Sequence, residues 1–324
     1  MFTRTWIVVL SLQLFTGTGC EKEPADVDFS ERQVFVQYDW SDGFTNDAVL
    51  CIHEGDDDAI WFGTGGDGLY RYKDYRFKHY TTANGLADNY VEAVFQLENG
   101  ELWIGTAGGL SVMDGSDFTN YYTSDPEIQI SDILQDKDGN TWMATQGYGC
   151  LIYNGEKVEQ YFDEECANCN FVNDLYLDDN SILWWGTRES IENYDGKYIY
   201  SYSEANGQPI KSVHSVYQDA WGDIWFGTSD FERERMIVFS GNKFIEKDLF
   251  NGLIPVVYAI AEDGMHNLWF GTIGCGVICY DGAIMESFQN SKGFKPKSVM
   301  SLCYDSKGNL WMGTFEDGVI KYIP

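Results

Sequence analysis

The chain has few basic residues for its size. Of its 324 residues only 21 are lysine or arginine, against 51 aspartate or glutamate, and the formal net charge at pH 7 is −30. A surface of this charge repels the phosphates of nucleic acids and the headgroups of anionic membranes. We therefore expect no nucleic-acid partner and no direct binding to an anionic bilayer.

Long hydrophobic runs are also lacking, except near the start. Residues 6–15 form a mostly apolar run of ten after Arg4, which is too short to span a bilayer as a mature helix. Small residues then lead to Cys20, and the pattern resembles a bacterial lipoprotein signal whose cysteine becomes the lipidated N-terminus. We predict a signal peptide over residues 1–20, followed by a polar tether over residues 21–32.

These predictions place the protein outside the cytoplasm. With Cys20 lipidated, the protein would be anchored in the bacterial cell envelope, at the outer membrane or cell surface, and would contact the membrane through its lipid anchor only. An ordinary secretory signal is the alternative, and it would make the protein secreted or periplasmic. No later segment is long and apolar enough to cross a membrane.

Histidine is scarce, and the cysteines do not form a metal pattern. The four histidines, which lack the spacing of a metal site, are His53, His79, His214 and His266. Cys166 and Cys169 form a single CxxC in a loop, for which a local disulfide or two free thiols are favoured over a redox or metal role. We predict neither a bound metal nor another cofactor.

One short stretch recurs along the whole chain. A Leu/Ile-Trp-x-Gly-Thr run appears in seven related copies, and in one of them Ala144 replaces the glycine. The tryptophans of these copies are Trp61, Trp103, Trp142, Trp184, Trp225, Trp269 and Trp311, at intervals of 39 to 44 residues. A period of this length with short β-like runs is typical of a β-propeller.

Each repeat contains short runs with β character, separated by turn signals. In the second repeat the runs are 90–96, 101–106, 110–113 and 117–122, and an Asp-Gly turn joins the last two. No helical period follows the signal segment. We predict an all-β fold, a seven-bladed β-propeller with four antiparallel strands per blade.

The two ends of the chain complete each other. The seventh repeat stops after its third strand, at 318–323, and residues 33–38 form a fourth strand without three preceding ones. A ring must close because an open array would leave bare sheet edges. We predict that the N-terminal strand completes the last blade, and that the propeller covers residues 33–324.

The repeat resembles the two-component regulator propeller repeat. The resemblance rests on Asp-x-x-Gly-x-Leu-Trp-x-Gly-Thr-x-x-Gly-Leu, best seen over 98–110 and 305–319, and it covers almost all of residues 33–324. It implies a seven-bladed propeller of the kind that forms the extracellular sensing half of hybrid two-component receptors, many of which are tied to polysaccharide use. This chain shows neither a kinase nor an immunoglobulin-like stalk.

Positions that all repeats share are expected to be scaffold, and positions that differ are candidates for a site. The tryptophans, and the apolar residues twelve and nine positions before them, are predicted to pack. The row ten positions before is small throughout, as we expect for seven strands around one axis. The row eleven positions before varies freely and is predicted to lie near the axial mouth, as Leu50, Glu92, Ser131, Asn173, His214, Tyr258 and Met300.

The loops after each Gly-Thr and the links between blades are expected on the same face as that row. They carry aromatic rings beside carboxylates and arginines, a combination that suits sugars because rings cover the apolar sugar face and charges bind hydroxyls. The predicted ligand-binding residues are Trp40, Glu92, Tyr148, Asn173, Arg188, His214, Asp230, Phe231, Arg233, Tyr258 and Phe315. Variable loops without a ligand are the alternative.

Two classes of function follow. We expect a non-catalytic, sensor-like propeller that binds a glycan or a protein partner on the loop face, because no nucleophile stands beside an oriented base in any motif. The alternative is a propeller lyase or hydrolase at the axial mouth. Its candidate acid–base residues are Asp132, Asp174, Glu92 and His214.

Overall fold

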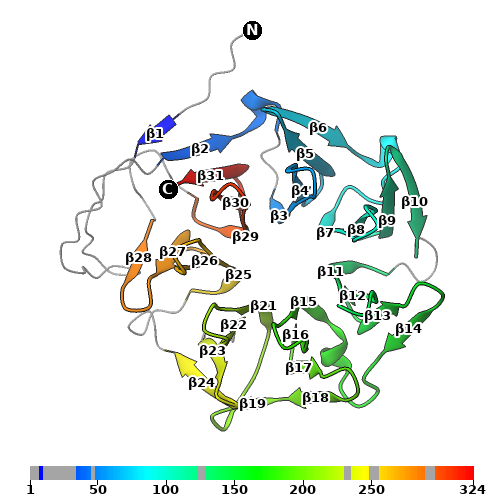
Figure 1. Ribbon diagram of the computed structural model, residues 1–324, viewed down its shortest axis with the longest axis vertical. Helices are drawn as coiled ribbons and strands as arrows, with labels where there is room; N and C mark the ends of the chain where they lie inside the picture. The colour runs from blue at the N-terminus through cyan, green and yellow to red at the C-terminus, as the bar shows by residue number, and fades with distance from the viewer. Residues whose placement is uncertain are drawn as a thin grey trace.

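The computed structural model describes residues 7–9, 34–44, 48–122, 128–229, 235–247, 255–288 and 296–324. These residues form a closed ring of antiparallel sheets around one axis, a seven-bladed β-propeller (Figure 1). The helices in these ranges are three 3-10 turns of three or four residues, η1 (Trp40–Asp42), η2 (Thr82–Asn84) and η3 (Ala167–Asn170). None of them could cross a bilayer, and the predicted fold class is confirmed.

Six blades each use four strands that are consecutive in sequence, from the axis outward. Blade 1 contains β3 (Val49–Glu54), β4 (Ile60–Thr64), β5 (Leu69–Lys73) and β6 (Arg76–Tyr80), and blade 2 contains β7 (Val91–Gln96), β8 (Leu102–Thr106), β9 (Gly109–Asp114) and β10 (Asp117–Tyr121). Blade 3 contains β11 (Ile130–Gln135), β12 (Thr141–Thr145), β13 (Cys150–Tyr153) and β14 (Val158–Tyr161), and blade 4 contains β15 (Val172–Leu177), β16 (Leu183–Thr187), β17 (Ile191–Tyr194) and β18 (Ile199–Tyr202).

Blades 5 and 6 follow the same plan. Blade 5 contains β21 (Val213–Gln218), β22 (Ile224–Thr228), β23 (Arg235–Ser240) and β24 (Lys243–Lys247), and blade 6 contains β25 (Val257–Glu262), β26 (Leu268–Thr272), β27 (Val277–Tyr280) and β28 (Met285–Ser287). A short hairpin of β19 (Glu204–Ala205) and β20 (Gln208–Pro209) lies in the link between blades 4 and 5.

The last blade joins the two ends of the chain. Its inner strands are β29 (Val299–Tyr304), β30 (Leu310–Thr314) and β31 (Val319–Ile323). Its outer strand is β2 (Val34–Tyr38), which pairs antiparallel with β31 along its whole length, as the sequence predicts. Three residues of the predicted signal peptide, β1 (Ile7–Val9), pair with β2 and add a fifth strand to this sheet. The tether and Cys20 lie outside the described residues.

The motif strand is the second strand of each blade, and it is buried. All seven motif tryptophans are only 1–6% exposed, and Trp61 packs against Val91 and Val94 of the next blade. Burying a ring of about 150–250 Å² contributes roughly 4–6 kcal/mol of transfer free energy, before entropy. The tryptophans therefore stabilise each junction between blades, as predicted.

The motif glycine allows two contacts at once. A Cβ on Gly63 would lie 2.4 Å from Cys51 Sγ in the same blade and 2.8 Å from the Val91 carbonyl oxygen in the next. The row ten positions before each tryptophan is therefore small because it faces this glycine across the strand pair. This contact, more than crowding at the axis, gives the physical reason for the small residues.

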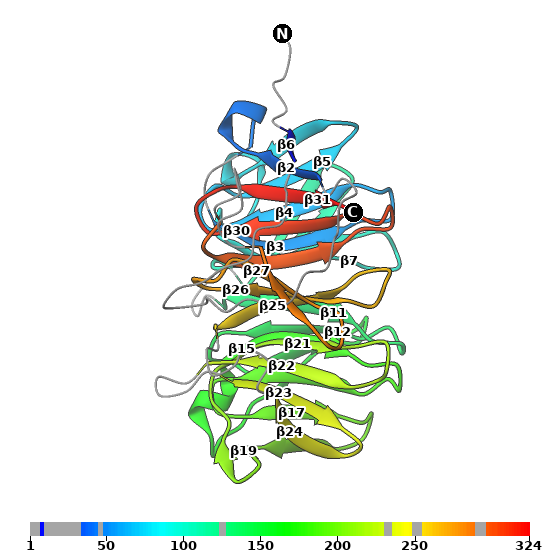
Figure 2. The same ribbon diagram turned by 90° about the vertical axis from the view of Figure 1, so that its left-hand side faces the viewer.

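The ring has two faces, which Figure 2 shows from the side. We call the side with the links between blades and the loops between second and third strands the loop face. Loop and link hydrogen-bond there, as in Gly65 N–H to the Ala48 carbonyl and Ile273 N–H to the Val256 carbonyl, which confirms that they share one face. We call the opposite side, with the turns between first and second strands, the turn face.

An aspartate caps the turn in five blades. In blade 3 the Asp136 carboxylate accepts hydrogen bonds from the Asn140 N–H at 2.9 Å and from Trp142 Nε1 at 2.9 Å. The equivalent indole bonds go to Asp178, Asp219, Asp263 and Asp305. Residues 136–140 therefore form a hairpin turn.

Candidate functional site

Each inner strand carries a β-bulge near the loop face. The pairing with the second strand skips one residue in every blade. The skipped residues are the row that lies eleven positions before the tryptophan, and all seven are half-buried. A bulge releases a side chain from the ladder and re-aims it, so this variable row is released at one level of all seven inner strands.

In blades 3 and 4 this row serves the scaffold. The free edge of each innermost strand leaves backbone groups without ladder partners. Ser131 Oγ donates to the Val172 carbonyl at 2.6 Å, and Asn173 Nδ2 donates to the Val213 carbonyl at 2.7 Å. Both acceptors belong to the following blade. Asn173, a predicted ligand-binding residue, therefore holds two blades together.

Asp132 and Asp174 act in the same way one position further along. Asp132 Oδ2 accepts the Leu175 N–H at 2.8 Å, and Asp174 Oδ2 accepts the Val216 N–H at 2.6 Å. Burial raises the pKa of Asp132 to about 6 and that of Asp174 well above its usual value, and the two carboxyl groups interact directly. The sequence-predicted pair is thus brought together, as a carboxyl pair that links blades 3, 4 and 5.

Blades 5 and 6 use the same row differently. The His214 and Tyr258 rings are stacked, with centroids 4.4 Å apart and an interplanar angle of 15°. His214 Nε2 lies 2.9 Å from Ser229 Oγ of the adjacent loop. Burial lowers the pKa of His214 to about 4 and raises that of Tyr258, so both side chains are uncharged at neutral pH. The stack presents an aromatic surface near the axis.

The strand β7 of blade 2 lies across the ring from β21 and β25 (Figure 1). Glu92 is in β7, and Tyr90 is in the link that precedes it. Glu92 Oε2 accepts a hydrogen bond from Gln129 Nε2 at 2.7 Å, and burial raises the Glu92 pKa. Burial also raises the Tyr90 pKa, and the neighbouring Glu92 and Tyr258 add to that shift. Tyr90 is therefore within electrostatic range of both sides, and we call Tyr90, Glu92, His214 and Tyr258 the axial cluster.

Sequence reasoning missed Tyr90, although a signal was present. It belongs to a second variable row, thirteen positions before each tryptophan, which reads Ala48, Tyr90, Gln129, Phe171, Ser212, Val256 and Ser298. Equivalent positions in the seven repeats differ in this row just as they do in the row eleven positions before each tryptophan. Gln129, the partner of Glu92, comes from the same row.

The predicted loop residues are dispersed around the axial cluster. Trp40, on the link between blades 7 and 1, is 72% exposed, and Phe315, on the loop of blade 7, is 53% exposed. Arg188 is exposed, and its guanidinium carbon lies 3.7 Å from the centre of the Phe171 ring. Tyr148 is half-buried, and its carbonyl accepts a bond from Gln160. Asp230, Phe231 and Arg233 lie outside the described residues.

The CxxC of the link between blades 3 and 4 is a disulfide. Cys166 and Cys169 are bonded, and Asp163 lies beside them with ligand atoms within 4.8 Å. A disulfide removes both sulfurs as metal ligands. Of the two alternatives that the sequence left open, the structure has the local disulfide.

The site offers binding groups more than an acid–base pair. The stacked His214 and Tyr258 rings, and the Glu92 carboxylate with its Gln129 amide partner, are groups that suit a ligand with an apolar face and hydroxyl groups. Among the described residues, no hydrogen bond joins Glu92 or His214 to the Asp132–Asp174 pair. The four candidate acid–base residues therefore divide into a scaffold pair and two separate groups.

Comparison with known families matches the repeat. The two component regulator propeller model matches residues 85–108, 124–147, 207–230 and 293–316. A curated relative, histidine kinase P4 of Formosa agariphila, is 28% identical over 230 residues, which cover 62% of this chain. The match covers 16% of that relative's length, so the chain is similar to a small part of a much longer protein.

Solved structures share the fold. The extracellular domain of a hybrid two component system from B. thetaiotaomicron superposes with a TM-score of 0.77 at 20% identity, over 90% of this chain and 41% of that one. A catalytically inactive histidine-to-alanine variant of virginiamycin B lyase from Staphylococcus aureus, with quinupristin, gives 0.72 at 15% identity, over 86% and 96% of the chains. At these identities the likeness shows the fold alone.

Proposed function

Because this chain is built from two-component regulator propeller repeats, we propose that it is a sensor-like binding protein that acts outside the cytoplasm. Its ligand is an oligosaccharide held at the axial mouth of the loop face. The observation that carries the proposal is the axial cluster. The repeat position that is released from the ladder in every blade holds the stacked His214 and Tyr258 rings in blades 5 and 6 and the Glu92 carboxylate in blade 2, with Tyr90 two residues before Glu92.

The chemistry of the cluster suits a sugar. The stacked His214 and Tyr258 rings offer an apolar surface for the C–H face of a pyranose. Glu92 and the Tyr90 hydroxyl supply an acceptor and a donor for sugar hydroxyls, and Gln129 fixes the Glu92 carboxylate. Exposed Trp40 and Phe315 extend the surface outward for further sugar units.

Export and anchoring belong to the same proposal. The apolar run 6–15 and the small residues before Cys20 support a lipoprotein-type signal, and the similarity to the extracellular domain named above supports a location outside the cytoplasm. Metabolic labelling with a radioactive fatty acid tests the anchor. We expect label on the wild type and none on Cys20→Ser, and a label-free wild type would contradict lipidation.

Binding is tested by calorimetry with a panel of neutral and acidic oligosaccharides. We expect at least one sugar to bind, and His214→Ala or Tyr258→Ala to weaken that binding about tenfold or more, as for a central aromatic contact. Tyr75→Ala is the matched control, because Tyr75 is 92% exposed on an outer hairpin turn. If no sugar binds, the glycan proposal fails and a protein partner becomes the alternative.

Catalysis at the axial mouth is a second candidate. The propeller shares its fold with virginiamycin B lyase, for which a histidine-to-alanine variant is inactive, and His214 stands uncharged in the axial cluster. Product analysis of each bound sugar distinguishes the two candidates. Turnover that His214→Ala or Glu92→Gln abolishes, with binding retained, would favour an enzyme.

A further inference from the structure

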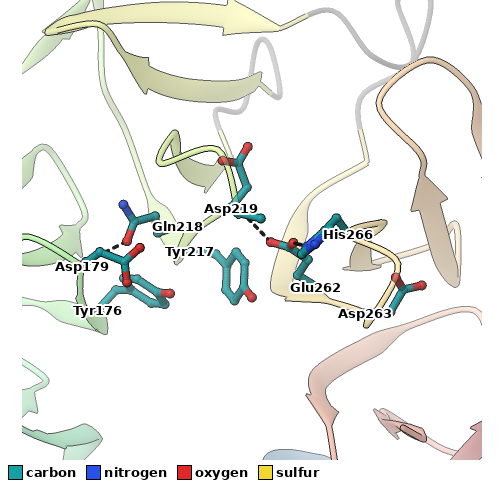
Figure 3. Close-up of a pocket in the computed structure, with 9 residues that line it drawn as sticks. Tyr176, Asp179, Tyr217, Gln218, Asp219, Glu262, Asp263 and His266 are labelled. Atoms are coloured by element: carbon teal, nitrogen blue, oxygen red, sulfur yellow. Dashed lines mark hydrogen bonds and ion pairs between the residues drawn. The ribbon is translucent and has the colours of Figure 1, made fainter.

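A cavity lies on the turn face, where blades 4, 5 and 6 meet. Its volume is about 300 Å³, and Figure 3 shows the side chains that line it. Tyr176 and Tyr217 come from the inner strands β15 and β21. Asp179 comes from the turn end of blade 4, and Glu262 and His266 come from the turn end of blade 6. The axial cluster is near the other face, so this cavity is a separate feature of the ring.

The rim of this cavity breaks the repeat. The tip of each inner turn lies four positions before the motif tryptophan, and five blades place a polar residue there, namely Asp57, Asn99, Asp138, Asn180 and Lys307. Blades 5 and 6 place Trp221 and Met265 instead, which are 66% and 72% exposed. The turn itself needs no apolar side chain, because five blades form it without one.

The apolar rim and the cavity are continuous. The Trp221 ring makes an edge contact with His266, a lining residue, with centroids 6.0 Å apart. Inside, the Tyr176 and Tyr217 rings lie 5.4 Å apart. Burial raises the pKa of both tyrosines, so their hydroxyls stay protonated. Together these residues form a surface with aromatic walls and an apolar edge.

The lining sets the charge of a ligand. Its four carboxylates are Asp179, Asp219, Glu262 and Asp263, and no lysine or arginine is among the lining residues. Asp219 and Asp263 bind the indoles of Trp225 and Trp269, and Glu262 accepts the Ala220 N–H and contacts His266 Nδ1 at 2.5 Å. Within the described part of the chain, no residue donates a hydrogen bond to the Asp179 carboxylate.

We propose that this cavity and its rim bind a segment of a partner protein in which a basic side chain stands next to an apolar one. The basic side chain enters the cavity beside the two tyrosine rings and pairs with Asp179, since a cation is favoured by both carboxylates and aromatic faces. The apolar neighbour covers Trp221 and Met265. A small cation inside the cavity would leave both of these exposed, which favours a polypeptide.

The test uses short capped peptides and the full-length protein. Acetyl-Leu-Arg-Leu-amide is titrated by calorimetry, next to the same peptide with citrulline, which keeps the shape of arginine without its charge. We expect the arginine peptide to bind and the citrulline peptide to bind about tenfold more weakly, as for loss of a charged contact. Equal binding of the two peptides, or no binding at millimolar concentration, would overturn the proposal.

Variants taken from the repeat itself localise the site. Trp221→Asn copies blade 4 and Met265→Lys copies blade 7, so both should fold. We expect each to weaken the arginine peptide about fivefold or more, and Asp179→Asn to remove the preference for arginine over citrulline. Asn99→Ala, at the tip of the blade 2 turn, is the matched control and should change nothing.

Two further outcomes bear on the partner. If acetyl-arginine-amide binds as tightly as the tripeptide and Trp221→Asn has no effect, the site accepts a small cation and the polypeptide part is wrong. If His214→Ala alters peptide binding, the two faces are not separate as proposed. Unchanged melting temperatures of all variants exclude loss of folding as the cause.

Discussion

At the bulge of the inner strand, blades 3 and 4 differ from blades 5 and 6. Ser131 and Asn173 hydrogen-bond to the backbone of the next blade, whereas His214 and Tyr258 stack on one another and leave that backbone alone. All four side chains occupy the same repeat position. The difference teaches that position in the repeat does not decide whether a residue is scaffold or site.

We call blades 3 and 4, whose side chains bond to the next blade, the scaffold half of the ring. These bonds meet a requirement that all propellers share. The innermost strand of a blade has one free edge, and buried backbone groups there need partners. Asp132, Asp174 and their neighbours supply these partners from the preceding blade. At the same position in blades 5 and 6, the His214 and Tyr258 rings stack on one another instead. The following predictions test this division, from the largest expected effect to the smallest.

Removing the closing strand β2 should unfold the scaffold half and the rest of the ring together. Deletion of residues 34–38 leaves β31 with an open edge in blade 7, and we expect no cooperative thermal transition, because each blade packs on its neighbours. Deletion of residues 1–20, which removes only the outer strand β1, is the control and should preserve the transition. A folded remnant of blades 3 to 5 after the first deletion would show that the scaffold half is autonomous.

Two substitutions at the same repeat position should have opposite profiles. Asn173→Leu strands the Val213 carbonyl, and we expect it to lower the free energy of unfolding by about 1–3 kcal/mol while sugar binding persists. His214→Leu should cost less than about 1 kcal/mol and should abolish binding. Urea unfolding and calorimetry check both. Equal stability losses would contradict the division into scaffold and site.

The carboxyl pair should give the scaffold half a distinct pH response. A raised pKa means that the contribution of the pair to stability is fully present below pH about 4 and is lost as the pH rises through about 6. Asp174→Asn keeps an oxygen for the Val216 N–H and removes one charge. We expect this variant to be more stable than the wild type at pH 8 by about 1–2 kcal/mol, and to match it at pH 4.

Urea unfolding at several pH values measures that effect. Asp195→Asn is a suitable control because Asp195 is exposed and its pKa is shifted downward by backbone N–H groups of its turn. A stability gain at pH 8 for the control as well, or none for Asp174→Asn, would exclude the carboxyl pair as the source.

The histidine of the axial cluster should respond in the opposite direction. Burial lowers the His214 pKa to about 4, so the unfolded chain takes up this proton first and stability falls as the pH drops from about 6.5 to 4. We expect His214→Gln to lose about 1–2 kcal/mol less than the wild type between pH 7 and 4.5. Unfolding curves at the two pH values check this. If the wild type and His214→Gln lose the same stability between these pH values, His214 is charged in the folded protein.

The fold could be predicted from the sequence because the same repeat occurs seven times. The buried tryptophan, the glycine against the next blade and the turn signals recur in each repeat, so errors in one repeat are corrected by the others. The pairing of residues 34–38 with 319–323 followed from a missing and a surplus strand. The pairing of Ile7–Val9 was not readable, because no repeat contains it.

The candidate site was readable only in part. The sequence singled out the variable row, but it did not predict the bulge on which this row lies. Which members serve the scaffold depends on whether their side chains reach the next blade, and only the three-dimensional structure shows this. Asn173 and His214 look equally free in the sequence. Tyr90, Trp221 and Met265 also lie in rows of equivalent repeat positions that differ between blades, so a comparison of the repeats could have singled them out. Their significance becomes plain only beside the axial cluster or the turn-face cavity.

Closure by β2 also fixes the order in which the molecule can be finished. β2 is the first strand of the seven-bladed ring to be synthesised, and it pairs with β31, the last strand of blade 7, so the ring cannot close before β31 has been made. Such a non-local pairing is slow to form, and the outer edge of β31 stays bare until it does.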